Sequence, residues 1–288
     1  MAFHSVEALC TAAGAVPLWE AVLLDDCQDR GVARDASFSR MAALWEAMKQ
    51  SVRDYDPDKR SACGLTGGTG AQVEQAAVGL MSPFVTAVMS TALKVGECNA
   101  CMGRIVAAPT AGASGVLPAV LLPMQKARGF SDEEAVRALF VAAGFGQVIA
   151  TRASIAGAEG GCQAEIGSAS AMGAAALVSL MGGTPEQMSF ACASALQNLM
   201  GLVCDPVAGL VELPCVRRNV IGSLNALAAA ELALAGVRNV IPCDEVIDAM
   251  RAVGDSLPSS LRETGGGGLA ATPTGRHIAE MLSGHTQN

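Results

Sequence analysis

The chain has 288 residues and a net charge of −8, and 51% of its residues are hydrophobic although only 3% are aromatic. An acidic chain without a run of Lys or Arg does not match the charge of a phosphate backbone, so nucleic acid is excluded as a partner. A core with so few aromatic residues must be filled by Ala, Val, Leu and Met, packed closely where glycine lets backbones approach.

The first 55 residues have the apolar spacing of amphipathic helices. Two groups carry this pattern: Val16, Trp19, Val22 and Leu23, and then Met41, Leu44, Trp45 and Met48. We expect residues 1–55 to form an N-terminal helical segment that packs on a second domain of residues 56–288.

A glycine-rich break at residues 61–70 separates these helices from the next helical pattern. That pattern runs from Ala71 to Val95 and stops near Gly96. The segment that follows is irregular, and a further helix is expected to begin at Ser114 or Gly115.

Three later helices carry start signals. Ser131 precedes Glu134 by three positions, the spacing of a capping box. Thr184 follows two glycines and precedes Pro185, which suits a cap and a first helical residue. Pro242 opens another helix. No run alternates in the manner of a strand. The predicted fold is therefore all-α, a Gly/Ala-rich, bundle-like helical domain with irregular glycine-rich loops.

Two uncharged runs, residues 105–125 and 166–185, are long enough to span a membrane. The first contains three prolines and the second consists largely of Gly, Ser and Ala. Both are interpreted as buried segments of a soluble core, and no membrane is expected as a partner. The N-terminus lacks a basic start followed by an apolar stretch, so no signal peptide is expected.

Ten cysteines without an export signal indicate a reducing compartment, and we predict a cytoplasmic location. Cys162 follows two glycines, whereas Cys204 and Cys215 bracket a segment in which Pro206, Gly209 and Pro214 forbid one continuous helix. Three thiolates of this kind are suited to an iron–sulfur cluster with one open, Lewis-acidic iron. Spacing alone favours the alternative that they are buried cysteines at helix ends.

Cys98 and Cys101 form a C-x-x-C motif, which suits zinc or a redox disulfide. No second pair at finger spacing accompanies it, and no βαβ pattern surrounds it. A non-catalytic zinc or redox protein is nevertheless retained as an alternative. The remaining cysteines are interpreted as packing residues.

Three glycine-rich segments carry small hydroxyl residues: 65–68, 109–115 and 262–269. Backbone N–H groups beside a Ser or Thr are suited to holding a carboxylate, although each segment also reads as a helix cap followed by a turn. His4, His277 and His285 lie near the chain ends, and none is nominated as a general base.

From about Gly64 to Thr274 the chain resembles the alpha subunit of the two-chain, iron–sulfur-dependent L-serine dehydratases. The matching segments are GLTGG, residues 99–103, APTAGASGVLPAVL, GGCQAEIGSASAMGAAAL, GGTPEQ, GLVCDPVAGLVELPCVRRN, IPCDEVIDAM and RETGGGGLAATPTGR. By this resemblance residues 56–288 are the catalytic domain.

The resemblance implies that Cys162, Cys204 and Cys215 hold a 4Fe-4S cluster. Serine is expected to bind the open iron while a base takes its α-proton. Loss of hydroxide then gives aminoacrylate and, by hydrolysis, pyruvate and ammonium. Pyridoxal phosphate is not needed. The expected role is amino-acid catabolism that supplies pyruvate for gluconeogenesis.

The expected substrate-binding residues are Thr66, Gly67, Gly68, Asn99, Thr110, Ser114 and Thr264. The base is unassigned and is expected on a partner beta subunit. A related lyase acting on L-cysteine remains the enzymatic alternative.

Two features depart from the family pattern. Position 101 is Cys where the family more often has Ser, and this substitution creates the C-x-x-C motif. The chain ends at Asn288 without a terminal cysteine that could bind the fourth iron. Water, substrate or a partner group is therefore expected at that iron in the resting state.

Overall fold

The computed structural model describes residues 3–14, 16–76 and 78–285. Its α-helices are α1 (Val6–Ala12), α2 (Leu18–Arg30), α3 (Arg34–Arg53), α4 (Thr69–Gln75), α5 (Pro83–Ala100), α6 (Val116–Arg128), α7 (Asp132–Arg152), α8 (Gly157–Gly160), α9 (Ser168–Leu180), α10 (Pro185–Leu199), α11 (Cys215–Leu234), α12 (Cys243–Ser256) and α13 (Pro273–His285). A π-helical turn, η1 (Gln163–Gly167), and the 3-10 turns η2 (Val207–Gly209), η3 (Ser259–Leu261) and η4 (Gly268–Ala271) complete the described elements. Within these ranges there is no β-strand, which confirms the all-α prediction.

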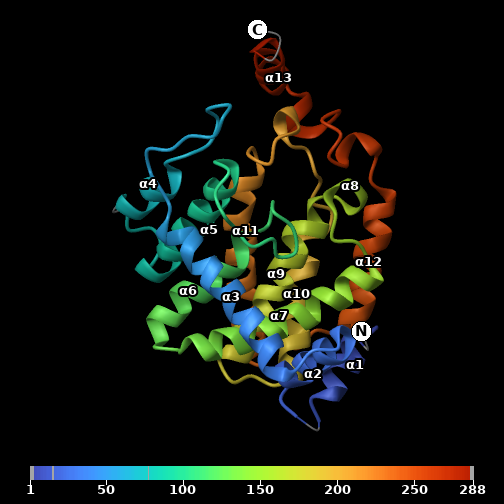
Figure 1. The fold of residues 1–288 in the computed structure, drawn as a ribbon. Coiled ribbons are helices and arrows are strands. Elements are labelled where there is room, and N and C mark those ends of the chain that lie inside the picture. The colour runs from blue at the N-terminus through green and yellow to red at the C-terminus, as the bar shows by residue number, and fades with distance from the viewer. Residues whose placement is uncertain (1–2, 15, 77, 286–288) are drawn as a thin grey trace.

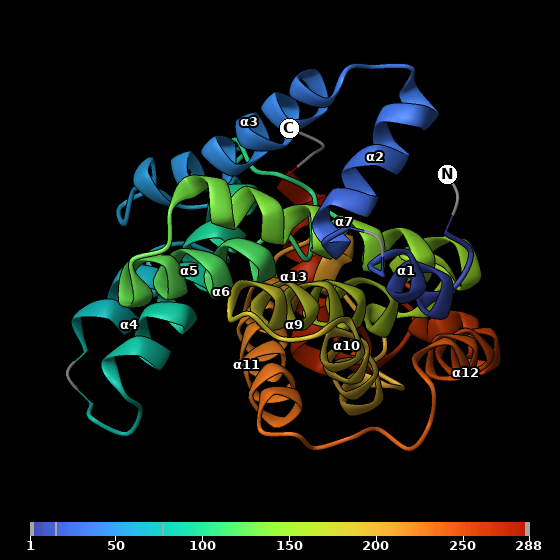
Figure 2. The ribbon, with the colours of Figure 1, turned by 90° about the horizontal axis from the view of Figure 1, so that it is seen from below.

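Helix α9 lies at the centre, surrounded by α6, α7, α10 and α11 (Figure 2). Its residues 168–178 are all buried, and most are Ala, Ser or Gly. Small side chains allow this close packing: a Cβ on Gly173 would already lie 3.4 Å from a Val120 methyl and 3.5 Å from Ala226. The Ala-rich composition therefore serves a tightly packed helical core.

The predicted helix starts are found where the sequence placed them. Ser131 and Glu134 form a capping box at α7, and Thr184 and Gln187 form one at α10, where Pro185 is the first residue. Helix α12 begins directly after Pro242. At α7 and α10 the cap satisfies a backbone N–H that the first helical turn leaves unpaired, whereas Pro242 makes no side-chain cap at α12.

The single helix expected over 71–95 is wrong, because α4 ends at Gln75 and α5 begins at Pro83. The Ser82 hydroxyl accepts a hydrogen bond from the Val85 N–H, so residues 82–85 start a new helix. Helix α5 also continues through Gly96 instead of stopping there. The reason is packing: a Cβ at Gly96 would lie 3.2 Å from Val216 of α11.

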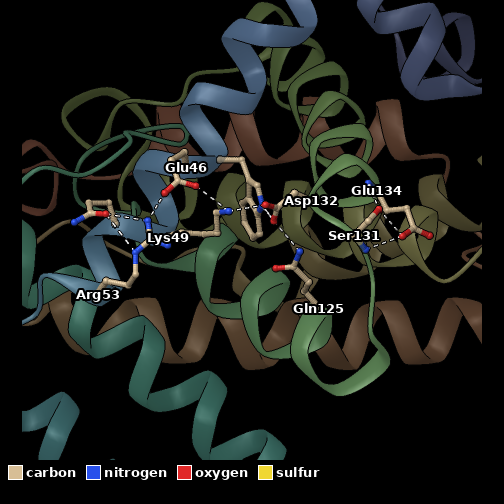
Figure 3. Close-up of polar contacts among 9 residues, drawn as sticks. Glu46, Lys49, Arg53, Gln125, Ser131, Asp132 and Glu134 are labelled. Carbon is tan, nitrogen blue, oxygen red and sulfur yellow. Dashed lines mark hydrogen bonds and ion pairs between the residues drawn. The ribbon is translucent and has the colours of Figure 1, made fainter.

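All three N-terminal helices contact the core, and α3 does so through a polar cluster at the start of α7 (Figure 3). The Asp132 carboxylate, at the start of α7, accepts hydrogen bonds from Trp45 Nε1 (2.8 Å), Lys49 Nζ (2.6 Å) and Gln125 Nε2 (2.9 Å). Trp45 also belongs to the same hydrophobic cluster as the core helices. The segment 1–55 thus packs on the rest of the chain, and the domain boundary at residue 55 stays a prediction.

Of the described helices, α7 alone is long and apolar enough to cross a membrane, and 67% of that stretch is buried inside the protein. The two runs noted in the sequence differ from it. Residues 105–125 are helical only from Val116 onward, and residues 166–185 contain the central helix α9.

The irregular segments gather at one end of the molecule. Residues 200–214 and 257–272 lie toward α13, opposite α1 and α2 (Figure 1). This end carries the cysteines singled out in the sequence.

Candidate active site

Cys162 sits on a turn between α8 and η1. Gly161 before it has a φ of +76°, which favours glycine, and a Cβ there would lie 2.7 Å from a Leu257 methyl. The Gln163 side chain anchors the turn: its Oε1 accepts from Gly201 N–H at 2.8 Å, and its Nε2 donates to the Met250 carbonyl at 3.0 Å. The Cys162 thiol is thereby fixed against the segment that leads to Cys204.

Cys204 and Cys215 bracket a segment without a continuous helix, as predicted, with only η2 between them. The Cys204 N–H donates to the Leu261 carbonyl at 2.9 Å, and the Glu263 N–H donates to the Cys204 carbonyl at 2.8 Å. Cys215 is the first residue of α11. Its carbonyl accepts from Asn219 Nδ2 at 3.0 Å, so Cys204 and Cys215 are held by different neighbours.

The three thiols are buried together. Their residues are exposed by 2%, 3% and 8% for Cys162, Cys204 and Cys215, and all ten cysteines of the chain are free. Burial raises the pKa of Cys162 to about 11 and that of Cys215 to about 12, and it also raises the pKa of Cys204. The charge of Cys162 adds to the rise at the other two, so the thiols lie close enough to repel as thiolates.

A carboxylate, Glu165, lies beside these thiols on η1. Its Oε2 is 4.0 Å from Cys204 Sγ. A Cβ on Gly157 would lie 2.7 Å from that oxygen and 2.9 Å from the sulfur, so only glycine fits. Burial raises the pKa of Glu165.

The loop 109–115 brings two buried hydroxyls to this region. Neither Thr110 Oγ1 nor Ser114 Oγ has a hydrogen-bond partner among the described residues. Asn219 of α11 holds the loop: its Oδ1 accepts from Gly115 N–H at 2.9 Å, and its Nδ2 donates to the carbonyls of Gly112 (2.8 Å) and Cys215 (3.0 Å). Buried hydroxyls without a partner are unfavourable, and they are typical of sites that receive a polar ligand.

The loop that holds Thr66, Gly67 and Gly68 is tied to the same segment by Glu212. The Glu212 carboxylate accepts from Ser61 Oγ at 2.7 Å and from Cys63 Sγ at 3.0 Å. Cys63 was expected to be a packing residue, and this contact shows that it also holds the loop.

Thr66 Oγ1 is a third buried hydroxyl without a partner among the described residues. Gly67 and Gly68 both have positive φ, and a Cβ on Gly67 would lie 2.3 Å from the Lys59 carbonyl oxygen. Packing therefore explains both glycines, and their binding role stays a prediction.

The last two expected binding residues lie at the margins. Thr264 is exposed and lines a 540 Å³ pocket with Ala208, Gly209 and residues of α13. Ala208 and Glu263, which also line it, have φ of +55° and +62°, so both loops hold non-glycine residues in left-handed conformations. Asn99 is half-buried near the end of α5, and none of the contacts described for it reaches Cys162, Cys204 or Cys215.

Cys98 and Cys101 line a separate pocket of 190 Å³ beside Tyr55 and Glu97. Burial raises the pKa of both thiols. Glu97 is already engaged, since it accepts from Tyr55 Oη at 2.6 Å and from Thr69 N–H at 2.9 Å. Among residues 3–14, 16–76 and 78–285, no three His, Cys, Asp or Glu side chains surround a point where a single metal ion would bind. The geometry does not support a zinc site here.

Three residues with clear structural roles were not singled out in the sequence: Glu212, Arg218 and Asn219. Two of them belong to the VRRN segment that follows Cys215, and their position one helical turn after a candidate ligand is the signal that was available. Of the histidines, His4 and His277 are exposed, and the His285 side chain lies outside the described part of the chain.

Comparison with known proteins gives a consistent result. Residues 13–270 match the family model "Serine dehydratase alpha chain". A Bacillus subtilis protein named "Probable L-serine dehydratase, alpha chain" is 49% identical over 250 residues, which cover 86% of this chain and 83% of that protein. A Latilactobacillus sakei protein of the same name is 60% identical over 196 residues, 68% of this chain and 94% of the relative. The Peptoniphilus asaccharolyticus "L-serine dehydratase, alpha chain" is 51% identical over 199 residues, 69% of this chain and 68% of the relative. The matched region contains all three buried thiols and the loops around them, and the chain belongs to the serine dehydratase alpha chain family.

Proposed function

We propose that this chain is the catalytic alpha subunit of an L-serine dehydratase, which converts serine to pyruvate and ammonia. The observation that carries the proposal is the meeting of three buried thiols, from three separate segments, beside buried hydroxyls without partners. The names of its relatives, at 49–60% identity, support serine as the substrate.

The donor set fits an iron–sulfur cluster. Thiolates are the ligands that such clusters require, and Cys162, Cys204 and Cys215 would each hold one iron. When bound, a cluster with three protein ligands supplies an open iron that acts as a Lewis acid on the substrate hydroxyl.

The protein's own residues bind and orient the substrate in this proposal. The unpaired hydroxyls of Thr110 and Ser114 donate to the serine carboxylate, and Asn219 keeps their loop in place. Because Gly157 has no side chain, the Glu165 carboxyl group can lie against Cys204. In this position the Glu165 carboxyl group shields the site from bulk water. Because the described histidine side chains, His4 and His277, are exposed, we place the base for the α-proton on a partner beta chain.

The test is performed anaerobically on the purified chain together with its partner. It measures the iron and sulfide content of the protein and the rate of pyruvate release from serine. Cys162→Ser, Cys204→Ser and Cys215→Ser should each abolish visible absorbance and activity, because a hydroxyl is a harder and far less acidic ligand. Cys10→Ser and Cys192→Ser are the matched controls and should retain both. Full activity in any one of the first three variants contradicts the proposal. Purified protein that contains zinc but no sulfide would also contradict the proposal.

The same assay defines the substrate. Serine, threonine and cysteine are offered side by side, with pyruvate and 2-oxobutyrate as the measured products. A preference for cysteine with release of sulfide would overturn serine as the substrate.

The partner is tested separately. The purified alpha chain should bind a cluster and turn serine over slowly, and added beta chain should raise kcat. If an alpha chain shown to be free of beta reaches the rate of the complex, the base lies on this chain.

A further inference from the structure

Arg218 is a largely buried cation close to the three thiols. It lies on α11 three residues after Cys215, and its side chain is 15% exposed. One guanidinium nitrogen donates to the Val203 carbonyl at 2.8 Å, and a second donates to Asp205 Oδ1 at 2.8 Å. Burial raises the pKa of the Cys162 thiol, and the charge of Arg218 opposes that rise. One cation therefore lies on the helix that begins at Cys215, bonds the residues on both sides of Cys204, and is close enough to Cys162 to act on its charge.

Asp205 extends this connection to the glycine-rich loop. It is 3% exposed, and its second oxygen accepts from Leu269 N–H at 2.7 Å. A Cβ on Gly268 would lie 2.3 Å from that same oxygen, so the loop approaches the carboxylate closely. Asp205 thus holds the planar Arg218 guanidinium in one orientation beside Cys204.

The charges around the thiols explain why a cation is needed. Three thiolates bring three negative charges, and the carboxylates of Glu165 and Glu263 also act on Cys204. The Arg218 guanidinium is the cation that acts on Cys162 and Cys215 in the opposite sense. Buried like charges require a counter-charge at short range.

We propose that Arg218, oriented by Asp205, is a positioning residue that fixes the backbone on both sides of Cys204 and offsets the negative charge of the cluster site. The inference rests on the proposed function, because it concerns how the thiolates retain a cluster. Outer contacts of this kind change metal affinity roughly ten- to hundredfold when they are removed.

The experiment uses the full-length chain, reconstituted anaerobically with ferrous iron and sulfide. Three variants are compared with wild type: Arg218→Gln, Arg218→Lys and the exposed neighbour Arg217→Gln as matched control. The readouts are iron and sulfide per chain, the rate of iron release to a chelator and the midpoint potential of the cluster. Thermal unfolding of each apo chain, followed by circular dichroism, monitors the fold.

Arg218→Gln should release iron roughly ten- to hundredfold faster than wild type. Its midpoint potential should be more negative, because a nearby cation favours the reduced, more negative cluster. Arg218→Lys, which keeps the charge and loses the fork, should recover the potential and only part of the retention. Arg217→Gln should match wild type in every readout.

Wild-type iron release and potential in a folded Arg218→Gln chain would overturn the inference. Loss of Arg218 leaves Asp205 buried without its partner, so that variant can fail to fold. In that event Arg218→Lys decides, and wild-type iron release in a folded Arg218→Lys chain refutes the role of the fork. If wild type itself takes up no iron and sulfide, the proposed cluster fails instead.

Discussion

The Glu212 carboxylate accepts a 2.7 Å hydrogen bond from Ser61 Oγ, although 151 positions separate the two residues in the chain. This contact joins the loop that holds Thr66 to the segment between Cys204 and Cys215. Two parts of the candidate active site therefore keep their relative position through one buried carboxylate.

Glu212→Ala should lower the free energy of unfolding by about 2 kcal/mol, because it leaves the Ser61 hydroxyl and the Cys63 thiol without an acceptor. It should also raise KM for serine more than it lowers kcat, since the Thr66 loop loses its attachment. Urea unfolding and steady-state kinetics measure the two effects. Glu231→Ala, at an exposed position of α11, is the control. Unchanged stability and KM in Glu212→Ala would show that the loop is held by other contacts.

Asn219→Ala should destabilise the protein by about 3 kcal/mol, because the buried Gly115 N–H is left without an acceptor and the Gly112 and Cys215 carbonyls each lose a donor. Asn198→Ala removes an amide from an exposed position and should cost less than about 0.5 kcal/mol. Thermal unfolding of the two variants provides the comparison. Equal losses would mean that loop 109–115 does not depend on Asn219.

Gly67→Ala and Gly64→Ala separate backbone strain from steric collision. Both glycines have positive φ, but a Cβ at Gly67 meets the Lys59 carbonyl oxygen at 2.3 Å, whereas nothing lies within 4 Å of one at Gly64. Gly64→Ala should cost about 1 kcal/mol from strain alone. Gly67→Ala should cost clearly more, because the backbone must also move. The denaturant concentrations at the unfolding midpoints of the two variants are compared. Equal midpoints would show that the collision at Gly67 adds no cost.

Asp132 makes a pH-dependent contribution. Its hydrogen bonds with Lys49, Gln125 and Trp45 lower its pKa from 3.8 to about 2. The stabilisation is therefore present above pH 3.8 and is lost as the pH falls toward 2. The side chain is 57% exposed, so Asp132→Asn should cost at most about 1 kcal/mol at pH 7 and less in high salt. Unfolding measured at pH 7 and pH 2 should show a difference between wild type and variant that is much smaller at pH 2. The exposed Asp58→Asn, as control, should show no such difference at either pH.

If the proposed open iron is present, activity should decay in air and return with ferrous iron and a thiol. An iron without a protein thiolate is exposed to oxidant, and its loss removes the Lewis acid. The measurement is pyruvate release before and after exposure to air, with an anaerobic sample as reference. Full activity after days in air and chelator would argue against the open iron.

Several parts of the fold could be predicted from the sequence because they depend on residues that are close together in the chain. Local hydrogen bonds explain the capping boxes at Ser131 and Thr184. Proline and glycine explain why no continuous helix joins Cys204 to Cys215. The helix expected over 71–95 failed for a different reason. The apolar spacing continues across the break, and Gly96 marks the close approach of α11 instead of the end of a helix.

The candidate site was predictable to a similar extent. The thiols stood out through their glycine and proline neighbours and through the family resemblance. The supports did not, because Glu212, Arg218 and Asn219 act on residues that are distant in the chain or on backbone carbonyls. No local spacing shows that Asn219 reaches Gly112, 107 positions earlier.

The bond from Leu269 N–H to Asp205 sets a limit on when the site can form during synthesis. The lining runs from the Ser61 loop to residue 269, so most of the chain must leave the ribosome before the last anchor is made. Until then the thiols belong to an open, unfinished pocket whose long loops remain to be closed. Under the proposed function, delivery of iron and sulfur would therefore be a late event, and a truncated or stalled chain would offer the three cysteines to the cell without the contacts that protect them.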